Sequence, residues 1–295
     1  MHRRLNESAS LLADGIRYER GGVVQRAREC FESVTRAERD FPEEAAEAWW
    51  RLANLHRLHS SWDEALTSAR KSAALAHEHG FPNTEADALN IEGAVWYLRG
   101  DYDQARVHYL RVLELATTQA TRAKAHQNLG SLAAEVGKFD EAEDLFAESR
   151  DAFRDAGDAR GEANSLLNMG RLQLDRGLAG LADRTLDEAV SAARLTGDLE
   201  MHAAALLTHG IVLGELGRAE EAEERIITAY GQFTIADIPV QRVRSLMQLA
   251  ALAMARSDSA AARICLLHAR DVAASSGLPR EVASIDERLV ALGPA

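Results

Sequence analysis

The feature that most constrains the fold of this 295-residue chain is a set of small residues that recurs seven times. One column of the pattern is always alanine, at Ala27, Ala65, Ala105, Ala142, Ala182, Ala222 and Ala262. These anchors are 38, 40, 37, 40, 40 and 40 residues apart. A period of this length is typical of arrays of small supersecondary units that stack on one another. The chain is therefore expected to be a repeat protein.

Three further columns keep a fixed distance from each anchor. Twelve residues before it stand Gly15, Ala53, Gly93, Gly130, Gly170, Gly210 and Ala250. Five residues before it stand Gly22, Ser60, Gly100, Gly137, Gly177, Gly217 and Ser257. Four residues after it stand the mostly bulky Phe31, Ala69, Tyr109, Phe146, Leu186, Ile226 and Leu266. A small residue lets two helices approach closely, and a glycine between them ends the first helix because it adopts left-handed φ values. Each unit is therefore predicted to be a helix A, a tight turn and a helix B.

This pattern predicts an all-α chain with a single continuous core and seven helix-turn-helix repeats. The repeats are expected at about residues 9–41, 43–81, 83–119, 121–158, 159–198, 199–237 and 239–277, within one domain covering residues 1–295. Pro42, Pro82, Pro239 and Pro279 fall at the junctions, where the missing N–H of proline is tolerated at the first turn of a helix. An amphipathic segment at 279–292 is expected to cap the last repeat, whose apolar face would otherwise be open.

The four columns together resemble the tetratricopeptide repeat (TPR) family over nearly the whole chain. The repeat length of about 40 residues is similar to a branch with long helices, which includes spindle-orientation adaptors, kinesin light chains, and bacterial peptide-sensing and regulatory TPR domains. The resemblance implies a right-handed superhelical solenoid. It also implies that helices A line the concave side, that helices B line the convex side, and that the family's usual activity is to bind another polypeptide.

Composition narrows the classes of partner. The formal net charge of −12 argues against nucleic-acid binding, because the surface as a whole repels phosphates. No window is apolar for the roughly 18 residues that a membrane span needs, and the N-terminus carries no signal-peptide pattern. Cys30 and Cys265 are interpreted as buried free thiols in a reducing cytoplasm. Only three of the 34 basic residues are lysine, which favours a GC-rich bacterial genome.

No sequence motif for catalysis is present. The chain lacks a P-loop, a dinucleotide-binding glycine pattern after a strand, an H-E-x-x-H pair and a C-x-x-C pair. His56 and His59, or His77 and His79, have no third and fourth ligand at a useful spacing for zinc. We therefore expect no enzyme activity, no cofactor and no metal.

A candidate peptide-binding surface follows from the stripe of helix A that faces away from helix B. Relative to the small residue of helix A, this stripe comprises positions −6, −3, −2, +1 and +4. In repeats two to five it carries amides, basic groups and two aromatic rings. The candidate residues are Trp50, Arg51, Asn54, Arg57, Asn90, Tyr97, Lys124, Gln127, Asn128, Asn164, Asn168 and Arg171. Asparagine can pair with both the N–H and the C=O of an extended backbone, and basic groups favour an acidic ligand. An alternative is that the asparagines bond neighbouring side chains within the solenoid.

The predicted function is a cytoplasmic scaffold or adaptor that binds a protein or peptide, not a nucleic acid or a membrane. One alternative is a peptide-responsive sensor module of a bacterial signalling or transcription-control system. Another is self-assembly into a homo-oligomer, through the more apolar sixth and seventh repeats or through exposed helix ends. The chaperone-type carboxylate clamp of the family is not expected, because in repeats two to four only Asn54 matches its five positions.

Overall fold

A computed structural model describes residues 2–20 and 23–293, and these residues form fifteen α-helices and no strand. The all-α architecture predicted from the repeat is confirmed. The helices belong to two compact units, residues 1–156 and 157–295, each with its own packed helices. Continuity of the two units in a single solenoid stays a prediction. The first turn residue of the pattern, Gly22, lies outside the described residues.

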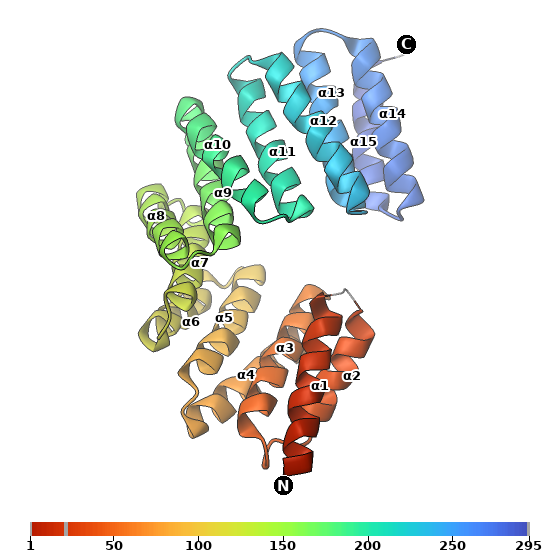
Figure 1. The fold of residues 1–295 in the computed structure, drawn as a ribbon. Helices are drawn as coiled ribbons and strands as arrows, with labels where there is room; N and C mark the ends of the chain where they lie inside the picture. Colours follow the sequence, from red (N-terminus) through yellow and green to blue (C-terminus); the bar gives the residue numbers. More distant parts are fainter. Residues whose placement is uncertain (1, 21–22, 294–295) are drawn as a thin grey trace. The chain divides into compact units, whose positions relative to one another are not determined.

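The first unit contains four helix pairs (Figure 1). They are α1 (His2–Arg20) with α2 (Val24–Thr35), α3 (Pro42–Leu58) with α4 (Trp62–His79), α5 (Pro82–Leu98) with α6 (Tyr102–Leu115), and α7 (Gln119–Glu135) with α8 (Phe139–Asp155). Helix α1 begins well before residue 9, where the first repeat was expected to start.

The second unit contains three helix pairs and a final single helix (Figure 1). They are α9 (Ala159–Asp175) with α10 (Ala179–Leu195), α11 (Leu199–Glu215) with α12 (Ala219–Ile235), α13 (Pro239–Ala255) with α14 (Ser259–Ser275), and then α15 (Pro279–Ala291). Helix α15 packs on α14 through the fully buried Ile285, as a capping helix should.

Five of the seven pairs are held by a close contact between a glycine of helix A and the bulky residue of helix B. A Cβ atom added to Gly130 would stand 2.8 Å from the ring of Phe146, and one added to Gly170 would stand 2.5 Å from Cγ of Leu186. In the second repeat both members are alanine, Ala53 and Ala69. In the pairs that contain a glycine, the bulky side chain occupies the space that a Cβ atom would take. The anchor alanines are completely buried in all seven pairs.

Each of the six described turns between helices A and B contains one residue in the left-handed region. Gly100, Gly137, Gly177 and Gly217 have φ between 74° and 79°. Ser60 and Ser257 adopt the same conformation with φ of 59° and 60°, although a side chain disfavours it. The four junction prolines lie in the first turns of α3, α5, α13 and α15, as their position in the sequence predicts.

Helices A form the inner layer within each unit. Neighbouring A helices touch directly, as α3 does with α5, α5 with α7, and α11 with α9 and α13. Neighbouring B helices make no comparable contact in the described part of the chain. The A helices are thus closer together than the B helices, so each unit curves with its A helices on the inner side. None of the described helices is long and apolar enough to cross a bilayer.

The two cysteines are less buried than the sequence predicts. Cys30 and Cys265 are free but only half-buried, because each lies beside the bulky position of its B helix and not in it. Burial raises the pKa of both thiols.

Candidate binding surface on the A helices

The predicted site residues divide between the two units. Those of the first unit lie on α3, α5 and α7, namely Trp50, Arg51, Asn54, Arg57, Asn90, Tyr97, Lys124, Gln127 and Asn128. Asn164, Asn168 and Arg171 lie on α9 of the second unit.

In the first unit Arg51 is the centre of an ion cluster. Its Nη1 donates to Glu19 Oε2 of α1 at 2.7 Å, and its Nη2 donates to Glu47 Oε1 at 2.8 Å. The guanidinium also lies 4.5 Å from the ring centre of Trp50, within the range of a cation–π contact. Arg51 therefore ties α1 to α3, and much of its bonding capacity is used inside the chain.

The amide of Asn54 is used in a similar way. Arg57 donates from Nη2 to Asn54 Oδ1 at 2.8 Å, one helical turn away. The Arg57 guanidinium is half-buried, and burial lowers its pKa. Because it has no carboxylate partner in the described part of the chain, this arginine keeps capacity for an anion.

Two further contacts join the A helices α5 and α7. Asn128 Nδ2 donates to Asn90 Oδ1 at 2.6 Å, and the Tyr97 hydroxyl donates to Glu135 Oε1 at 3.0 Å. Asn90, Asn128 and Asn54 thus all bond neighbouring side chains, which is the alternative that the sequence left open. Their part in binding a ligand stays a prediction.

Lys124 and Gln127 complete the first-unit group. Lys124 is exposed and faces Asp87 of α5, which was not among the predicted site residues. Burial raises the pKa of Asp87, while Lys124 and Arg51 oppose that rise. The inner surface of the first unit is therefore an alternating array of acidic and basic groups that largely compensate one another.

The α9 residues of the second unit are arranged differently. Asn164 and Arg171 are exposed and Asn168 is half-buried. None of the three side chains has a hydrogen bond or an ion pair with the described part of the chain. Two amides and a guanidinium on α9 therefore have no hydrogen-bond partner among the described residues and can bond to solvent or to a ligand.

Arg244 of α13 extends this group, although it was not among the predicted site residues. Its guanidinium has no carboxylate partner among the described residues, and its pKa is lowered by burial and then by the nearby charge of Arg171. Two like charges near each other are unfavourable unless an anion lies between or beside them. The signal was present in the sequence, because Arg244 occupies the same −6 position of its A helix as Asn164.

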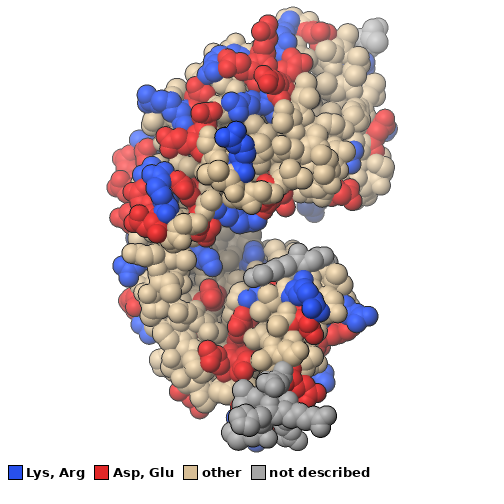
Figure 2. Space-filling model, in the orientation of Figure 1, with Lys and Arg blue, Asp and Glu red and all other residues tan. Residues whose placement is uncertain are grey.

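Apolar side chains lie along the same stripe. Leu174 and Ile211 are half-buried, and Met254 is half-exposed, at the +4, +1 and +4 positions of α9, α11 and α13. Figure 2 shows one face of the molecule, on which Lys and Arg side chains are interspersed with Asp and Glu and separated by uncharged surface.

Three leucines that the sequence places on the open stripe are buried. Leu12, Leu167 and Leu207 at position −3 are 8%, 7% and 2% exposed, so they belong to the core. Position −3 faces the next A helix, and a leucine there is covered where two A helices touch. In the described residues, no group of three His, Cys, Asp or Glu side chains could hold a metal ion.

Comparisons with known proteins agree with this architecture. A family model described as tetratricopeptide repeat matches residues 121–194. The regulatory protein AfsR of Streptomyces griseus is 27% identical over 153 residues, which are 51% of this chain and 16% of that protein. This chain thus spans only a small part of the length of that relative.

Solved structures show the same fold at low sequence identity. The apo form of RapI has a TM-score of 0.65 and 14% identity, covering 91% of this chain and 99% of that one. A Rap protein in complex with Competence and Sporulation Factor has a TM-score of 0.66 and 16% identity, covering 95% of this chain and 80% of that one.

Stacked helical hairpins with an inner layer of A helices define the class of α-solenoid repeat proteins. Within that class, the family model identifies residues 121–194 as tetratricopeptide repeats, and the same column pattern recurs in the other repeats.

Proposed function

We propose that this protein is a non-catalytic binding module that holds an extended peptide or protein segment along its A helices. The observation that carries the proposal is the set of unpartnered polar side chains on α9 and α13, Asn164, Asn168, Arg171 and Arg244. Polar side chains that have no internal partner, beside partly exposed apolar ones, are available for a ligand. The remaining predicted residues of the first unit are proposed as weaker, additional contacts.

The chemistry of these side chains suggests the kind of ligand. Asn164 and Asn168 lie four residues apart on one face of α9, so their amides can pair with successive polar groups of an extended backbone. Arg171 and Arg244 suit a carboxylate, from an acidic side chain or a C-terminus. Leu174, Ile211 and Met254 offer contacts for apolar side chains. We propose an acidic or carboxylate-ended peptide segment as the ligand.

The similar proteins favour a regulatory role for the module. One of them is a Rap protein that binds Competence and Sporulation Factor, and another is the regulatory protein AfsR. A bacterial, cytoplasmic module that responds to a peptide is therefore proposed ahead of a constitutive adaptor. The two differ in whether binding alters the activity of a second protein.

The test begins with affinity capture of partners from the native host, followed by calorimetric titration with the captured polypeptide. The double variant Asn168→Ala/Arg171→Ala should retain the fold and bind about tenfold more weakly or worse, because each lost hydrogen bond to a ligand is worth roughly 1 kcal/mol and more when a charge takes part. Arg280→Ala on α15, which removes an exposed arginine away from this stripe, is the matched control and should bind normally. Equal binding by the double variant and the wild type would refute the proposal.

A further inference from the structure

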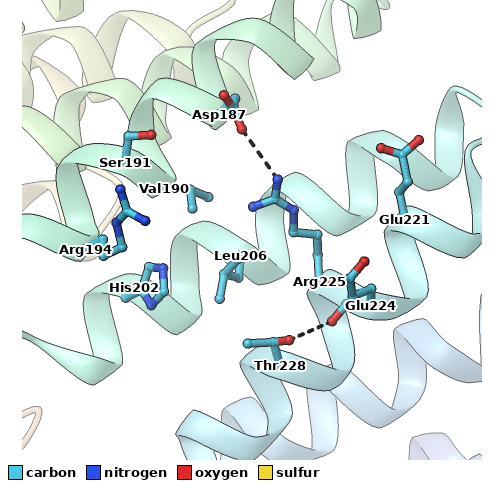
Figure 3. A pocket seen from close by; sticks show the side chains of 10 residues that line it. All are labelled: Asp187, Val190, Ser191, Arg194, His202, Leu206, Glu221, Glu224, Arg225 and Thr228. Carbon is cyan, nitrogen blue, oxygen red and sulfur yellow. Dashed lines mark hydrogen bonds and ion pairs between the residues drawn. The ribbon is translucent and has the colours of Figure 1, made fainter.

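A second feature lies on the outer side of the second unit, where α10, α11 and α12 enclose a cleft of about 510 Å³. We call this the outer cleft (Figure 3). It is lined by Asp187, Val190, Ser191 and Arg194 of α10, His202 and Leu206 of α11, and Glu221, Glu224, Arg225 and Thr228 of α12. Val190 and Leu206 are 7% and 4% exposed and form an apolar floor.

The repeat pattern allows a comparison with the junction of α4, α5 and α6 in the first unit. Counted from the anchor and the small residue of each repeat, Arg194 corresponds to His77 and His202 corresponds to Glu85. In that junction Glu85 is 8% exposed and supplies a carboxylate to its neighbours. His77 Nδ1 lies 3.2 Å from Glu85 Oε2, and Arg111 Nη2 lies 4.0 Å from Oε1.

At the equivalent positions of the second unit, histidines replace the acidic residues of the A helix. Helix α5 carries Glu85 and Glu92, and α11 carries His202 and His209 at the same two positions. Glu92 has Arg70 at 3.4 Å, and His209 has Asp183 at 2.8 Å. Three of these four groups therefore have a partner of opposite type inside the chain, and His202 is the exception.

His202 instead faces polar and basic groups. Its Nδ1 contacts the Gln232 amide nitrogen of α12 at 3.1 Å. Burial lowers its pKa, the bond to Gln232 opposes this, and the charges of Arg194 and Arg225 lower the pKa further. No carboxylate within the described residues pairs with Arg194.

The acidic residues of the outer cleft do not pair with Arg194 or His202. Asp187 lies 3.5 Å from Arg225, and Glu221 lies 2.5 Å from Arg218. Glu224 lies on the α12 side of the cleft, away from Arg194 and His202. Figure 3 shows Arg194, His202 and Ser191 together at one end of the cleft, with Glu221 at the opposite end. The end formed by Arg194 and His202 is thus basic, and it lacks the carboxylate that Glu85 provides in the other junction.

We propose that the outer cleft binds a small carboxylate-bearing molecule, whose carboxylate lies beside Arg194 and His202 and supplies the acidic group that this junction lacks. The guanidinium donates to the carboxylate, and an N–H of the imidazole donates a second bond. The hydroxyl of Ser191 lies at the same end, and the apolar floor can cover a short carbon chain. The volume of the cleft is in the range of small-molecule sites, which favours a free organic acid over a folded partner.

The experiment is calorimetric titration of the full chain at constant ionic strength with three probes: succinate, its neutral analogue succinamide, and inorganic phosphate. Succinate should bind saturably and succinamide should not. Arg194→Ala, on an exposed site that should not disturb folding, should weaken succinate binding about tenfold or more, because a charge-assisted hydrogen bond is lost. Arg280→Ala is the matched control and should bind succinate as the wild type does.

A second variant introduces the missing group. His202→Glu restores the acidic residue of the first-unit junction, so it should abolish succinate binding and raise the thermal unfolding midpoint by giving Arg194 an internal partner. Absence of saturable succinate binding to the wild type would overturn the proposal, as would binding that Arg194→Ala leaves unchanged. Binding of phosphate without succinate would overturn the assignment of a carboxylate ligand. Asn168→Ala/Arg171→Ala should bind succinate normally, which separates this site from the one on the A helices.

Discussion

The A helices of the two units carry similar residue types, and those residues have different fates. On α3, α5 and α7 the polar side chains bond one another, as Arg51 does with Glu19 and Glu47, and Asn128 does with Asn90. On α9 the polar side chains Asn168 and Arg171 have no such partner in the described part of the chain. An asparagine or arginine on the inner layer therefore stabilises the fold in one unit and is available to a ligand in the other.

This difference shows that a repeat position alone does not define a binding residue. The outcome depends on whether the neighbouring A helix carries a complementary side chain within hydrogen-bond distance. In the first unit α1, α3 and α5 supply such groups, whereas α11 of the second unit carries Ala204, Thr208 and Ile211 at the open positions of its stripe. The same repeat therefore gives bonded polar side chains in the first unit and unpartnered ones on α9.

The largest expected effect concerns what the two units share. Gly130→Ala and Gly170→Ala should each lower the free energy of unfolding by about 1–3 kcal/mol, because the added Cβ overlaps Phe146 or Leu186. Chemical denaturation followed by circular dichroism measures this. Gly231→Ala in α12 is the control, since nothing lies within 4 Å of its added Cβ, and it should be neutral or stabilising. If only one of the two variants is destabilised, the packing is not common to both units.

The next effect separates the units. Arg51→Ala should lower the free energy of unfolding by about 1–3 kcal/mol, because two partly buried carboxylates lose their charged partner. Arg171→Ala should change it by less than about 0.5 kcal/mol, because no internal contact is lost. The same denaturation measurement applies to both. Equal losses would mean that the arginine of the second unit also has a structural role.

The smallest effect concerns the asparagines. Asn128→Ala should lower the free energy of unfolding by about 0.5–1.5 kcal/mol, since Asn90 loses its hydrogen-bond partner. Asn168→Ala removes no internal bond and replaces asparagine by a better helix former, so stability should stay the same or rise slightly. Thermal unfolding monitored by calorimetry resolves such differences. A larger loss for Asn168→Ala than for Asn128→Ala would reverse the comparison.

The helices could be predicted from the sequence because their causes are local. A small residue sixteen positions before a bulky one, as Gly130 is before Phe146, specifies one close contact within one hairpin. A glycine or serine between them specifies the turn, and a proline marks the next helix start. These signals lie within about forty residues and repeat, so each unit supports the interpretation of the others.

The candidate site could be predicted only in part, because its determinants lie between repeats. The bond from Asn128 to Asn90 joins residues 38 positions apart that belong to different columns, −2 and −3. The buried leucines at −3 show that one column can be core in one repeat and polar in another. Arg244 was omitted because its importance depends on Arg171, two A helices away. Such pairings depend on the distance between helices, which the repeat pattern does not contain.

The strict spacing of the second unit has a consequence for how such a gene can change in length. Two junctions forty residues apart carry the same helix end and helix start: Gly157 and Gly197 take left-handed φ values, and Asp158 and Asp198 cap the helices that follow. A duplication or deletion of the forty codons between two such junctions would rejoin a glycine to an aspartate and leave both flanking helices correctly terminated. The protein can therefore gain one more helix-turn-helix repeat, with copies of Asn164, Asn168 and Arg171, in a single duplication. No further mutation is needed at the new Gly-Asp junction.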